Sequence, residues 1–361
     1  MKSTYIHIPF CEKICTYCDF CKIYYKKKWI KTYLEALKKE ISETYNGESI
    51  KTIYIGGGTP TSLELEELDE LCEILKLIDQ SCVQEITVEC NVENITTEKL
   101  KILKKNNVTR LSIGVQTFNE KYLSFLGRNH RKEDVKRVVA EAREIGFDNI
   151  NIDLMYGFYG QTLDELKVDI EEFMKLDVEH LSVYSLIIEE NTALYIKDVP
   201  EIDEDINAKM YHYIKKYLTQ YNYHHYEISN YAKDGYESKH NLVYWNNEEY
   251  YGFGLGASSF IGDRRYENTK SLSKYLKGDY VSSTKKLNKK EQMENEIILG
   301  LRKLTGVDNE KFKKKYGKEI SEVFELDKLL KGKQLIKKNN QYLIPEEYLF
   351  ISNEILINFI D

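Results

Sequence analysis

Residues 7–20 read His-Ile-Pro-Phe-Cys-Glu-Lys-Ile-Cys-Thr-Tyr-Cys-Asp-Phe and put Cys11, Cys15 and Cys18 in the spacing C-x3-C-x2-C. Thiolates are the usual protein ligands of iron–sulfur clusters. A short loop with three of them can bind three irons of a 4Fe–4S cluster and leave the fourth iron without a protein ligand. An open coordination position on a metal is a place for chemistry, as it is on catalytic zinc. The spacing therefore predicts a 4Fe–4S cluster with one open iron.

Other interpretations of the cysteines are weaker. The chain has seven Cys, an odd number, and the others are scattered in apolar segments, which argues against a disulfide framework. A zinc site with Cys21 or His7 as fourth ligand is an alternative. Cys21 could also be a fourth or substitute cluster ligand, but a fourth thiolate would fill the open position, so we interpret it as a bystander. Cys72, Cys82 and Cys90 are predicted to be small core residues.

The composition argues against several classes of protein. The chain has 361 residues, enough for one large domain and a small one, and its net charge of −7 argues against nucleic-acid binding through bulk charge. No long apolar run is present, so we expect no membrane span, while peripheral membrane association stays open. The N-terminus runs directly into a strand, which leaves no room for a signal peptide. We therefore expect a cytoplasmic, reducing location, and either a monomer or a homodimer.

Short β-rich runs alternate with amphipathic helical patterns in the first half of the chain. This alternation predicts parallel strands joined by right-handed crossovers. Six such units suit an α/β fold, a partial (β/α)6 TIM-like barrel, with a doubly wound sheet as the alternative. In both folds the carboxyl ends of the strands carry the chemistry. The predicted strands are Thr4–Ile8, Thr52–Ile55, Glu85–Glu89, Arg110–Val115, Asn149–Leu154 and His180–Leu186, and the predicted helices are Trp29–Tyr45, Leu63–Leu77, Thr97–Asn106, Glu133–Ile145 and Thr162–Leu176.

The pattern changes after Lys290 to a small helix-rich, winged-helix-like α+β module. Its end is acidic and it has no evident basic recognition helix, so we interpret it as a structural lid rather than a DNA-binding unit. We divide the chain into a core barrel at 1–235, an intermediate segment at 236–288 and this module at 289–361. The elements predicted in the module are helices Glu291–Leu304, Asn309–Tyr316 and Ile320–Leu330, a β-wing of Leu335–Lys338 and Gln341–Pro345, and a last helix from Tyr348.

Polar and glycine residues follow the predicted strands where packing alone would favour apolar ones. Gly56-Gly57-Gly58-Thr59-Pro60 comes directly after the second strand, and a backbone without side chains lets a ligand approach closely. Each polar residue alone could equally make a structural hydrogen bond or ion pair. Together they predict a polar ring at the barrel mouth. Its members are Glu89, Asn91, Gln116, Arg128 and Asp153.

The cysteine spacing, with an aromatic residue before the third Cys, and the glycine run resemble the signature of radical S-adenosylmethionine (SAM) proteins. In that superfamily the open iron chelates the amino and carboxylate groups of SAM. Arg128 then suits a carboxylate, Asp153 a ribose hydroxyl, and Met155 could face the adenine. The resemblance assigns no catalytic residue; it implies cluster ligation by Cys11, Cys15 and Cys18, and SAM contacts by Tyr5, Gly57, Gly58, Thr59, Glu89, Gln116, Arg128, Asp153 and Met155, with Tyr5 packed by the cluster.

A second motif, H-N-x-x-Y-W, contains His240, Tyr244 and Trp245. Imidazole is a common ligand of heme iron, and aromatic rings can flank a porphyrin. On the residues alone, a buried His in an aromatic core patch is an equally good interpretation. His224 and His225 are alternative iron ligands, or residues of an edge strand.

The Gly-Gly-Gly-Thr-Pro run resembles the oxygen-independent coproporphyrinogen III oxidase-like family, and H-N-x-x-Y-W resembles its heme-chaperone branch, the HemW-type proteins. Phe20 stands where the oxidases typically have a further Cys, and the cysteine loop begins early in the chain; both favour the chaperone branch. Ser258 stands where the family often has His. The resemblance implies a protein that binds heme through His240, Tyr244 and Trp245 and delivers it to heme proteins such as respiratory ones. Alternatives are oxidative decarboxylation of coproporphyrinogen III, which we do not expect, and radical heme degradation.

Overall fold

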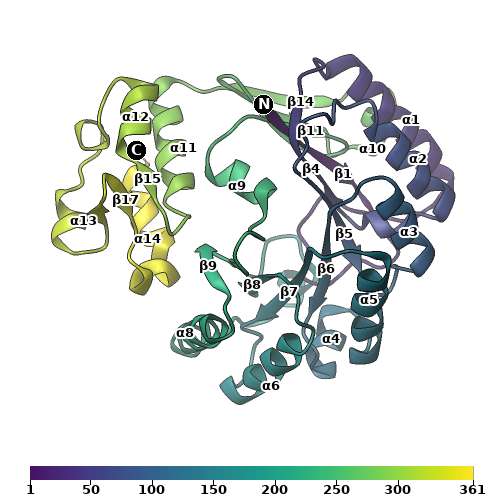
Figure 1. Ribbon diagram of the computed structural model, residues 1–361, viewed down its shortest axis with the longest axis horizontal. Helices are drawn as coiled ribbons and strands as arrows, with labels where there is room; N and C mark the ends of the chain where they lie inside the picture. Colours follow the sequence, from purple (N-terminus) through teal and green to yellow (C-terminus); the bar gives the residue numbers. More distant parts are fainter. Residues whose placement is uncertain (361) are drawn as a thin grey trace.

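The computed structural model describes residues 1–360 and has a curved sheet with helices along its outer face (Figure 1). The sheet has twelve strands in the order β14-β13-β12-β11-β1-β4-β5-β6-β7-β8-β10-β9. Six adjacent parallel strands are each followed in the chain by a helix, which confirms the predicted partial (β/α)6 barrel. These strands are β1 (Lys2–Ile8), β4 (Ile50–Gly57), β5 (Glu85–Asn91), β6 (Arg110–Gln116), β7 (Ile150–Tyr156) and β8 (His180–Ser185).

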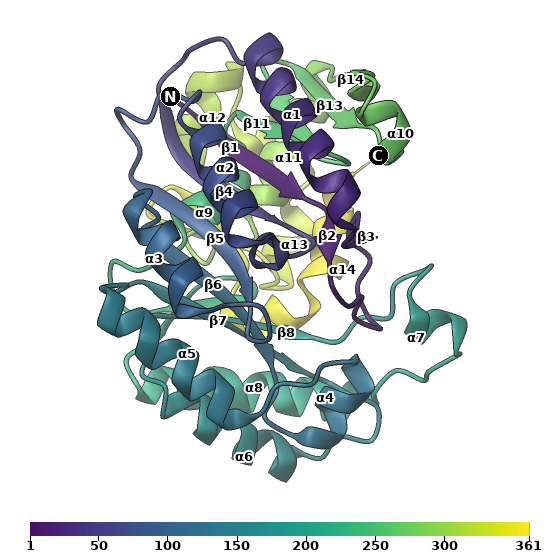
Figure 2. The same cartoon turned by 90° about the vertical axis from the view of Figure 1, so that its right-hand side faces the viewer.

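The helices between these strands pack one apolar face on the sheet. In α5 the buried residues Val135, Val138, Val139 and Ala142 recur at the three- and four-residue spacing of a single helix face. Figure 2 shows α1, α2, α3 and α5 side by side over the strands. The helices are α1 (Lys27–Thr44), α2 (Leu65–Leu75), α3 (Thr97–Lys105), α4 (Glu120–Leu126), α5 (Lys132–Ile145), α6 (Leu163–Met174), α7 (Ala193–Ile196) and α8 (Glu204–Gln220).

Both ends of the parallel sheet are extended by short strands, of which the sequence analysis considered only an edge strand at His224 and His225. On one side β10 and β9 continue antiparallel from β8, and on the other β11 pairs parallel with β1 before an antiparallel run. Helix α9 (Lys239–Trp245) lies between these two extensions (Figure 1). The added elements are β9 (His224–Glu227), β10 (Asn230–Ala232), β11 (Tyr250–Phe253), β12 (Ser258–Ile261), β13 (Arg264–Asn268), α10 (Leu272–Tyr275) and β14 (Val281–Lys286).

The C-terminal module contains the predicted wing, strands β16 and β17, within a three-stranded sheet ordered β15-β17-β16. The predicted helix Ile320–Leu330 is wrong. A 3-10 turn at Ile320–Glu322 is followed by α13 only at Asp327, because Phe324 packs its ring 5.5 Å from Phe359 and tertiary packing overrides a weak helical pattern. The elements are α11 (Lys289–Gly300), β15 (Val307–Asp308), α12 (Asn309–Tyr316), α13 (Asp327–Lys331), β16 (Ile336–Lys338), β17 (Gln341–Leu343), a 3-10 helix at Glu346–Ile351, α14 (Ser352–Leu356) and a 3-10 turn at Ile357–Phe359.

The segment after α11 binds the edge strand β9. The Ile228 amide donates to the Arg302 carbonyl at 3.1 Å, and the Leu304 amide donates to the Tyr226 carbonyl at 3.2 Å. The module thereby covers an edge that would otherwise expose unpaired backbone groups.

Between residues 1 and 360, no helix combines the length and apolar character needed to cross a bilayer.

The register of the parallel strands brings the predicted polar residues together. Glu89 of β5 pairs with Ser112 of β6, and Gly114 of β6 pairs with Asp153 of β7. Glu89 and Gly114 lie in the carboxyl-terminal halves of their strands, Asp153 lies at the centre of β7, and Ser112 lies in the first half of β6. Among the remaining cysteines, Cys72 and Cys90 are buried as predicted, but Cys82 is exposed because it lies in the turn before β5, so its assignment to the core is wrong.

A buried carboxylate, Glu40 of α1, joins the barrel to the 250–280 region. It accepts hydrogen bonds from the Gly254 amide at 2.8 Å, the Asn268 amide nitrogen at 2.5 Å and the Tyr275 hydroxyl at 2.6 Å. Burial raises its pKa, against the effect of these three donors. The three bonds tie α1 to segments more than two hundred residues away in the chain.

We predict that Glu40→Ala lowers the free energy of unfolding by about 2–4 kcal/mol, because buried donors lose their acceptor. The matched control is Glu43→Ala on the exposed face of the same helix, where we expect a change within about 0.5 kcal/mol. Urea unfolding followed by circular dichroism measures both. Equal effects of the two substitutions would contradict a structural role for the Glu40 contacts.

Candidate functional site

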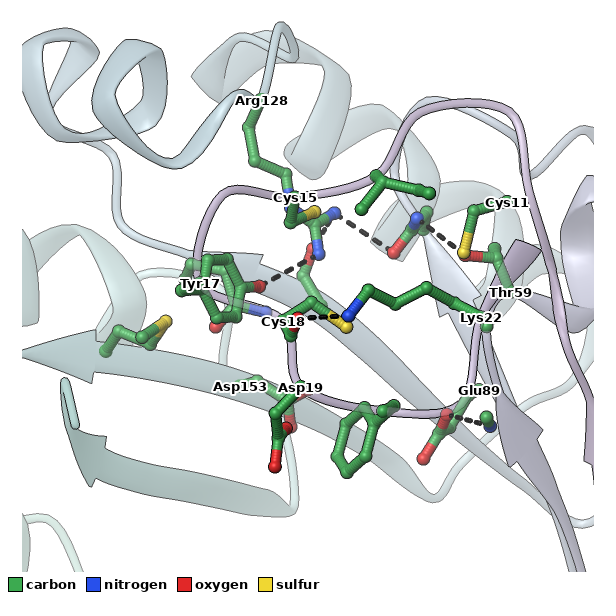
Figure 3. A pocket seen from close by; sticks show the side chains of 18 of the residues that line it. Cys11, Cys15, Tyr17, Cys18, Asp19, Lys22, Thr59, Glu89, Arg128 and Asp153 are labelled. Carbon is green, nitrogen blue, oxygen red and sulfur yellow. Dashed lines mark hydrogen bonds between the residues drawn. The ribbon is translucent and has the colours of Figure 1, made fainter. Parts of the chain in front are cut away.

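The cysteine loop lies at the carboxyl end of β1 and is held on both sides by backbone hydrogen bonds. The Tyr25 amide donates to the Cys11 carbonyl at 2.8 Å, which pairs β2 (Phe10–Cys11) with β3 (Ile23–Tyr24). The Thr16 amide donates to the Leu126 carbonyl of α4 at 3.1 Å. Cys11, Cys15 and Cys18 all line one cavity of about 310 Å³. Figure 3 shows this loop around the cavity, with Glu89 and Asp153 on the strands beside it.

The three thiols have the chemistry of cluster ligands. Burial raises the pKa of Cys11 to about 12, partly offset by the Thr59 hydroxyl 3.8 Å from its Sγ, and burial also raises the pKa of Cys18. Metal binding must therefore displace the thiol protons. Within residues 1–360, no three His, Cys, Asp or Glu side chains converge closely enough to share a single metal ion. A 4Fe–4S cluster binds each thiolate to a different iron, so this donor set fits a cluster.

Cys21 and His7, the residues considered as extra ligands, have other partners. The wall of the cavity does not include Cys21, whose Sγ would lie 2.9 Å from a side-chain carbon added at Gly256. The His7 ring contacts the Tyr5 hydroxyl at 2.9 Å through Nδ1 and the Cys21 carbonyl at 2.6 Å through Nε2. Neither residue is brought to the three thiols.

The glycine run allows the strand β4 to approach the cysteine loop. Gly57 has a left-handed φ of +114°, and an added Cβ would lie 2.5 Å from the His7 ring. At Gly58 an added Cβ would lie 2.6 Å from the Pro9 carbonyl carbon. Gly57, Gly58 and Thr59 all line the cavity, as predicted from their position after the strand.

Two half-buried carboxylates, Glu89 and Asp153, face the same cavity. Glu89 accepts from the Tyr54 hydroxyl at 2.8 Å and from the Gly57 amide at 3.0 Å, and burial raises its pKa to about 7. Asp153 accepts from the Asn151 amide at 2.8 Å, and burial raises its pKa as well. Hydroxyl or amine groups of a ligand could donate hydrogen bonds to these two carboxylates and stabilise their charged form.

Arg128 brings a positive charge to the wall of the cavity beside the cysteine loop. One guanidinium nitrogen donates to Asn91 Oδ1 at 3.0 Å and to the Gly114 carbonyl at 3.3 Å. The other donates to the Tyr17 hydroxyl at 3.4 Å, and Tyr17 is the aromatic residue just before Cys18. The buried Nε has no hydrogen-bond partner among the described residues. A planar cation in this position suits a ligand carboxylate.

Two further SAM candidates, Gln116 and Met155, also line this cavity. Gln116 is buried, and its φ of +74° is left-handed, a strained conformation for a residue with a side chain. Its Oε1 accepts from the Tyr184 hydroxyl at 2.8 Å. Met155 is buried in the wall next to an apolar cluster that includes Phe158.

Tyr5 does not line the cluster cavity but a second one, of about 290 Å³, together with Tyr54, His240 and Tyr244. This volume is at the lower limit of typical ligand pockets. The two cavities share Phe20, Gly57 and Glu89. Phe20 is 62% exposed, which is unusual for a large apolar side chain, and it therefore stands at the entrance to both.

Of the heme candidates, His240 and Tyr244 meet in the second cavity and Trp245 does not. His240 contacts Thr52 Oγ1 through Nδ1 at 2.8 Å and the Tyr244 hydroxyl through Nε2 at 2.9 Å. Burial lowers the pKa of His240 to about 3, so the ring is neutral. Trp245 lies under Arg302, whose guanidinium carbon is 5.7 Å from the ring centroid, and lines a different cavity near α11.

The alternative histidines lie outside the second cavity. His224 Nε2 contacts Glu237 at 2.7 Å, and His225 stacks on Tyr231 with ring centroids 4.4 Å apart. Both belong to the edge strand β9.

The sequence analysis missed several residues of the two walls. Ser112 lies two residues before Gly114 and therefore on the same face of β6, so the two-residue period of a strand could have identified it. Tyr54 was missed because the sequence of a buried strand does not show which group a tyrosine hydroxyl will bond to. The missed residues that line a cavity include Tyr17, Asp19, Lys22, Tyr54, Ser112, Tyr184 and Ile187.

Comparisons with known proteins agree with this geometry. The radical SAM superfamily profile matches residues 5–173, and the HemN C-terminal domain profile matches residues 287–347. The chain is 44% identical to "Heme chaperone HemW" of Bacillus subtilis, over 90% of this chain and 89% of that protein. It is 41% identical to the protein of the same name from Lactococcus lactis, over 92% of each.

Among solved structures, coproporphyrinogen III oxidase (HemN) from Escherichia coli, described as a radical SAM enzyme, matches with a TM-score of 0.88. The identity is 23%, over 99% of this chain and 89% of that one, so the match shows the shared fold. The chain belongs to the radical SAM superfamily and, within it, to the family of proteins named heme chaperone HemW.

Proposed function

We propose that this chain is a cytoplasmic heme chaperone that binds a 4Fe–4S cluster, SAM and heme and delivers heme to heme-accepting proteins. The observation that carries the proposal is the wall common to the two cavities, formed by Phe20, Gly57 and Glu89. One cavity has thiols of the cluster type, and the other has an imidazole among tyrosines. The name of relatives up to 44% identical supports the same function.

For the cluster, we assign Cys11, Cys15 and Cys18 as ligands and Cys21 as dispensable. A cluster bound there would supply an open iron for the amino and carboxylate groups of SAM. The loop fixes the positions of the three thiols, because its backbone forms hydrogen bonds with β3 and α4. All seven cysteines are free thiols, which suits a reducing compartment.

We predict that Cys15→Ala loses the cluster and that Cys21→Ala, the matched control, retains it. Iron and sulfide are counted after anaerobic reconstitution, and the absorption of the cluster is recorded. The reason is that Cys15 lines the cluster cavity while Cys21 packs at Gly256. If both substitutions lost iron to the same extent, a cluster with an open iron would be excluded.

For SAM, the side chains in the wall have complementary roles. Arg128 pairs with the carboxylate of the ligand, and Asp153 accepts from its ribose hydroxyls. Glu89, Gln116 and the backbone of Gly57 to Thr59 provide further polar contacts, and Met155 packs against the adenine. Tyr5 contributes only through Glu89 and Gly57, since it lines the neighbouring cavity.

We predict that Asp153→Asn and Arg128→Lys each weaken SAM binding about ten- to hundredfold, because each removes a charge-assisted hydrogen bond. Isothermal calorimetry on reconstituted protein measures the affinity, and thermal unfolding checks the fold. Asp164→Asn makes the same change of charge at an exposed position and should leave the affinity unchanged. Unchanged affinity in both site variants, with an intact fold, would reassign Asp153 and Arg128 to structural roles.

For heme, we assign the second cavity, with His240 as the leading iron ligand and Tyr244 beside it. Trp245 would act from outside the cavity, through its packing on Arg302.

The alternative function is oxidative decarboxylation of coproporphyrinogen III, which requires consumption of that porphyrinogen and no stable heme binding. Radical degradation of heme would instead consume the heme.

We predict that heme shifts its Soret band on binding to the wild type and that His240→Ala loses this shift. On the same cluster-loaded preparation we expect no protoporphyrinogen and no loss of heme in the presence of SAM and a reductant. Turnover of coproporphyrinogen III would overturn the chaperone in favour of the oxidase. A Soret shift that persists in His240→Ala would move the iron ligand to another residue, with His224→Ala and His225→Ala as the next variants.

A further inference from the structure

The iron-binding candidate His240 is in contact with a residue of its own helix. Tyr244 lies four positions along α9, and residues at this spacing face each other on a helix. Its hydroxyl is 2.9 Å from His240 Nε2, and the two rings meet edge to face with centroids 5.1 Å apart. Both residues line the second cavity, so this contact lies where a ligand would enter.

The hydrogen bonds around His240 fix its tautomer. A threonine hydroxyl has one proton, and Thr52 donates it to Ser3 Oγ at 2.9 Å. The contact between Thr52 Oγ1 and His240 Nδ1, at 2.8 Å, must therefore use a proton on Nδ1. Nε2 then carries the lone pair and accepts the hydrogen bond from the Tyr244 hydroxyl.

This is the arrangement in which a histidine is ready to bind a metal. A metal-binding imidazole donates through one nitrogen to a fixed partner and binds the metal through the other. Thr52 is buried and is the fixed partner, while the ring of Tyr54, 5.1 Å away, restricts rotation of the imidazole. Among the described residues, the Tyr244 hydroxyl is the one group that occupies the Nε2 lone pair.

We propose that Tyr244 is a latch on the heme site: its hydroxyl occupies His240 Nε2 in the heme-free protein and must leave before heme iron can bind there. This inference rests on the proposed heme-binding function. Because the hydroxyl competes with iron for one lone pair, it lowers the affinity of the protein for heme. A protein that delivers heme needs such reversible binding.

The same pair of residues allows a competing assignment. Tyrosine phenolate is itself a known heme ligand, and Tyr244 oxygen could bind the iron while its proton moves to His240 Nε2. Burial raises the pKa of Tyr244 well above its usual value, which disfavours the phenolate. The two assignments predict opposite effects of removing the hydroxyl, so one substitution separates them.

The test is Tyr244→Phe, which removes the hydroxyl and keeps the ring. We expect heme to bind the variant about three- to tenfold more tightly, with the difference mainly in faster association and little change in release, because the Nε2 lone pair no longer has to be freed first. Affinity is measured by Soret titration of the full-length, cluster-reconstituted chain, and release by transfer of heme to apomyoglobin. The control is Tyr250→Phe, whose ring packs edge-on against Tyr244 at 4.8 Å without contacting His240 Nε2, and which should bind heme as the wild type does.

The double variant His240→Ala/Tyr244→Phe completes a double-mutant cycle. In the His240→Ala background, Tyr244→Phe should not raise the affinity for heme, because no Nε2 lone pair remains. Equal affinity of the wild type and Tyr244→Phe would overturn the latch and leave the heme function intact. Loss of the Soret shift in Tyr244→Phe would also overturn it, and would assign the iron to the phenolate. Absence of a Soret shift in the wild type would instead refute the proposed function on which the latch rests.

Discussion

The contact between the cysteine loop and the end of β4 is the constraint on which the rest of the site depends. The Gly58 amide donates to the Ile8 carbonyl at 2.8 Å, and the Thr59 amide donates to the Phe10 carbonyl at 2.9 Å. The two backbones are so close that a Cβ at Gly58 would lie 2.6 Å from Pro9. Only glycine fits such an approach. Because of it, the three thiols face the carboxyl ends of the neighbouring strands rather than solvent.

The polar side chains in the wall opposite the thiols lower the stability of the folded protein. Arg128 is buried with an unpaired Nε, Gln116 is strained, and burial raises the pKa of Glu89 to about 7. Apolar residues in these positions would pack without such penalties. A strained glutamine and an unpartnered guanidinium nitrogen in the wall of one cavity suit a site that binds a ligand.

Much of this arrangement was predictable because it depends on local patterns. Strand–helix alternation identified the six parallel strands, and the shared direction of those strands brought Glu89 and Asp153 together. Of the antiparallel extensions only the edge strand at His224 and His225 was considered, and β14 was missed because it is exposed along its whole length and has no periodic burial. Trp245 was grouped with His240 from one short motif, but successive residues of a helix point in different directions, so Trp245 lies under Arg302 instead. The division into three units stays a prediction.

The two cavities are neighbours with side chains in common. Glu89 lines both, and its carboxylate accepts from the hydroxyl of Tyr54, whose ring lies 5.1 Å from that of His240. One carboxylate therefore contributes to the wall of the cluster cavity and, through Tyr54, to the surroundings of His240.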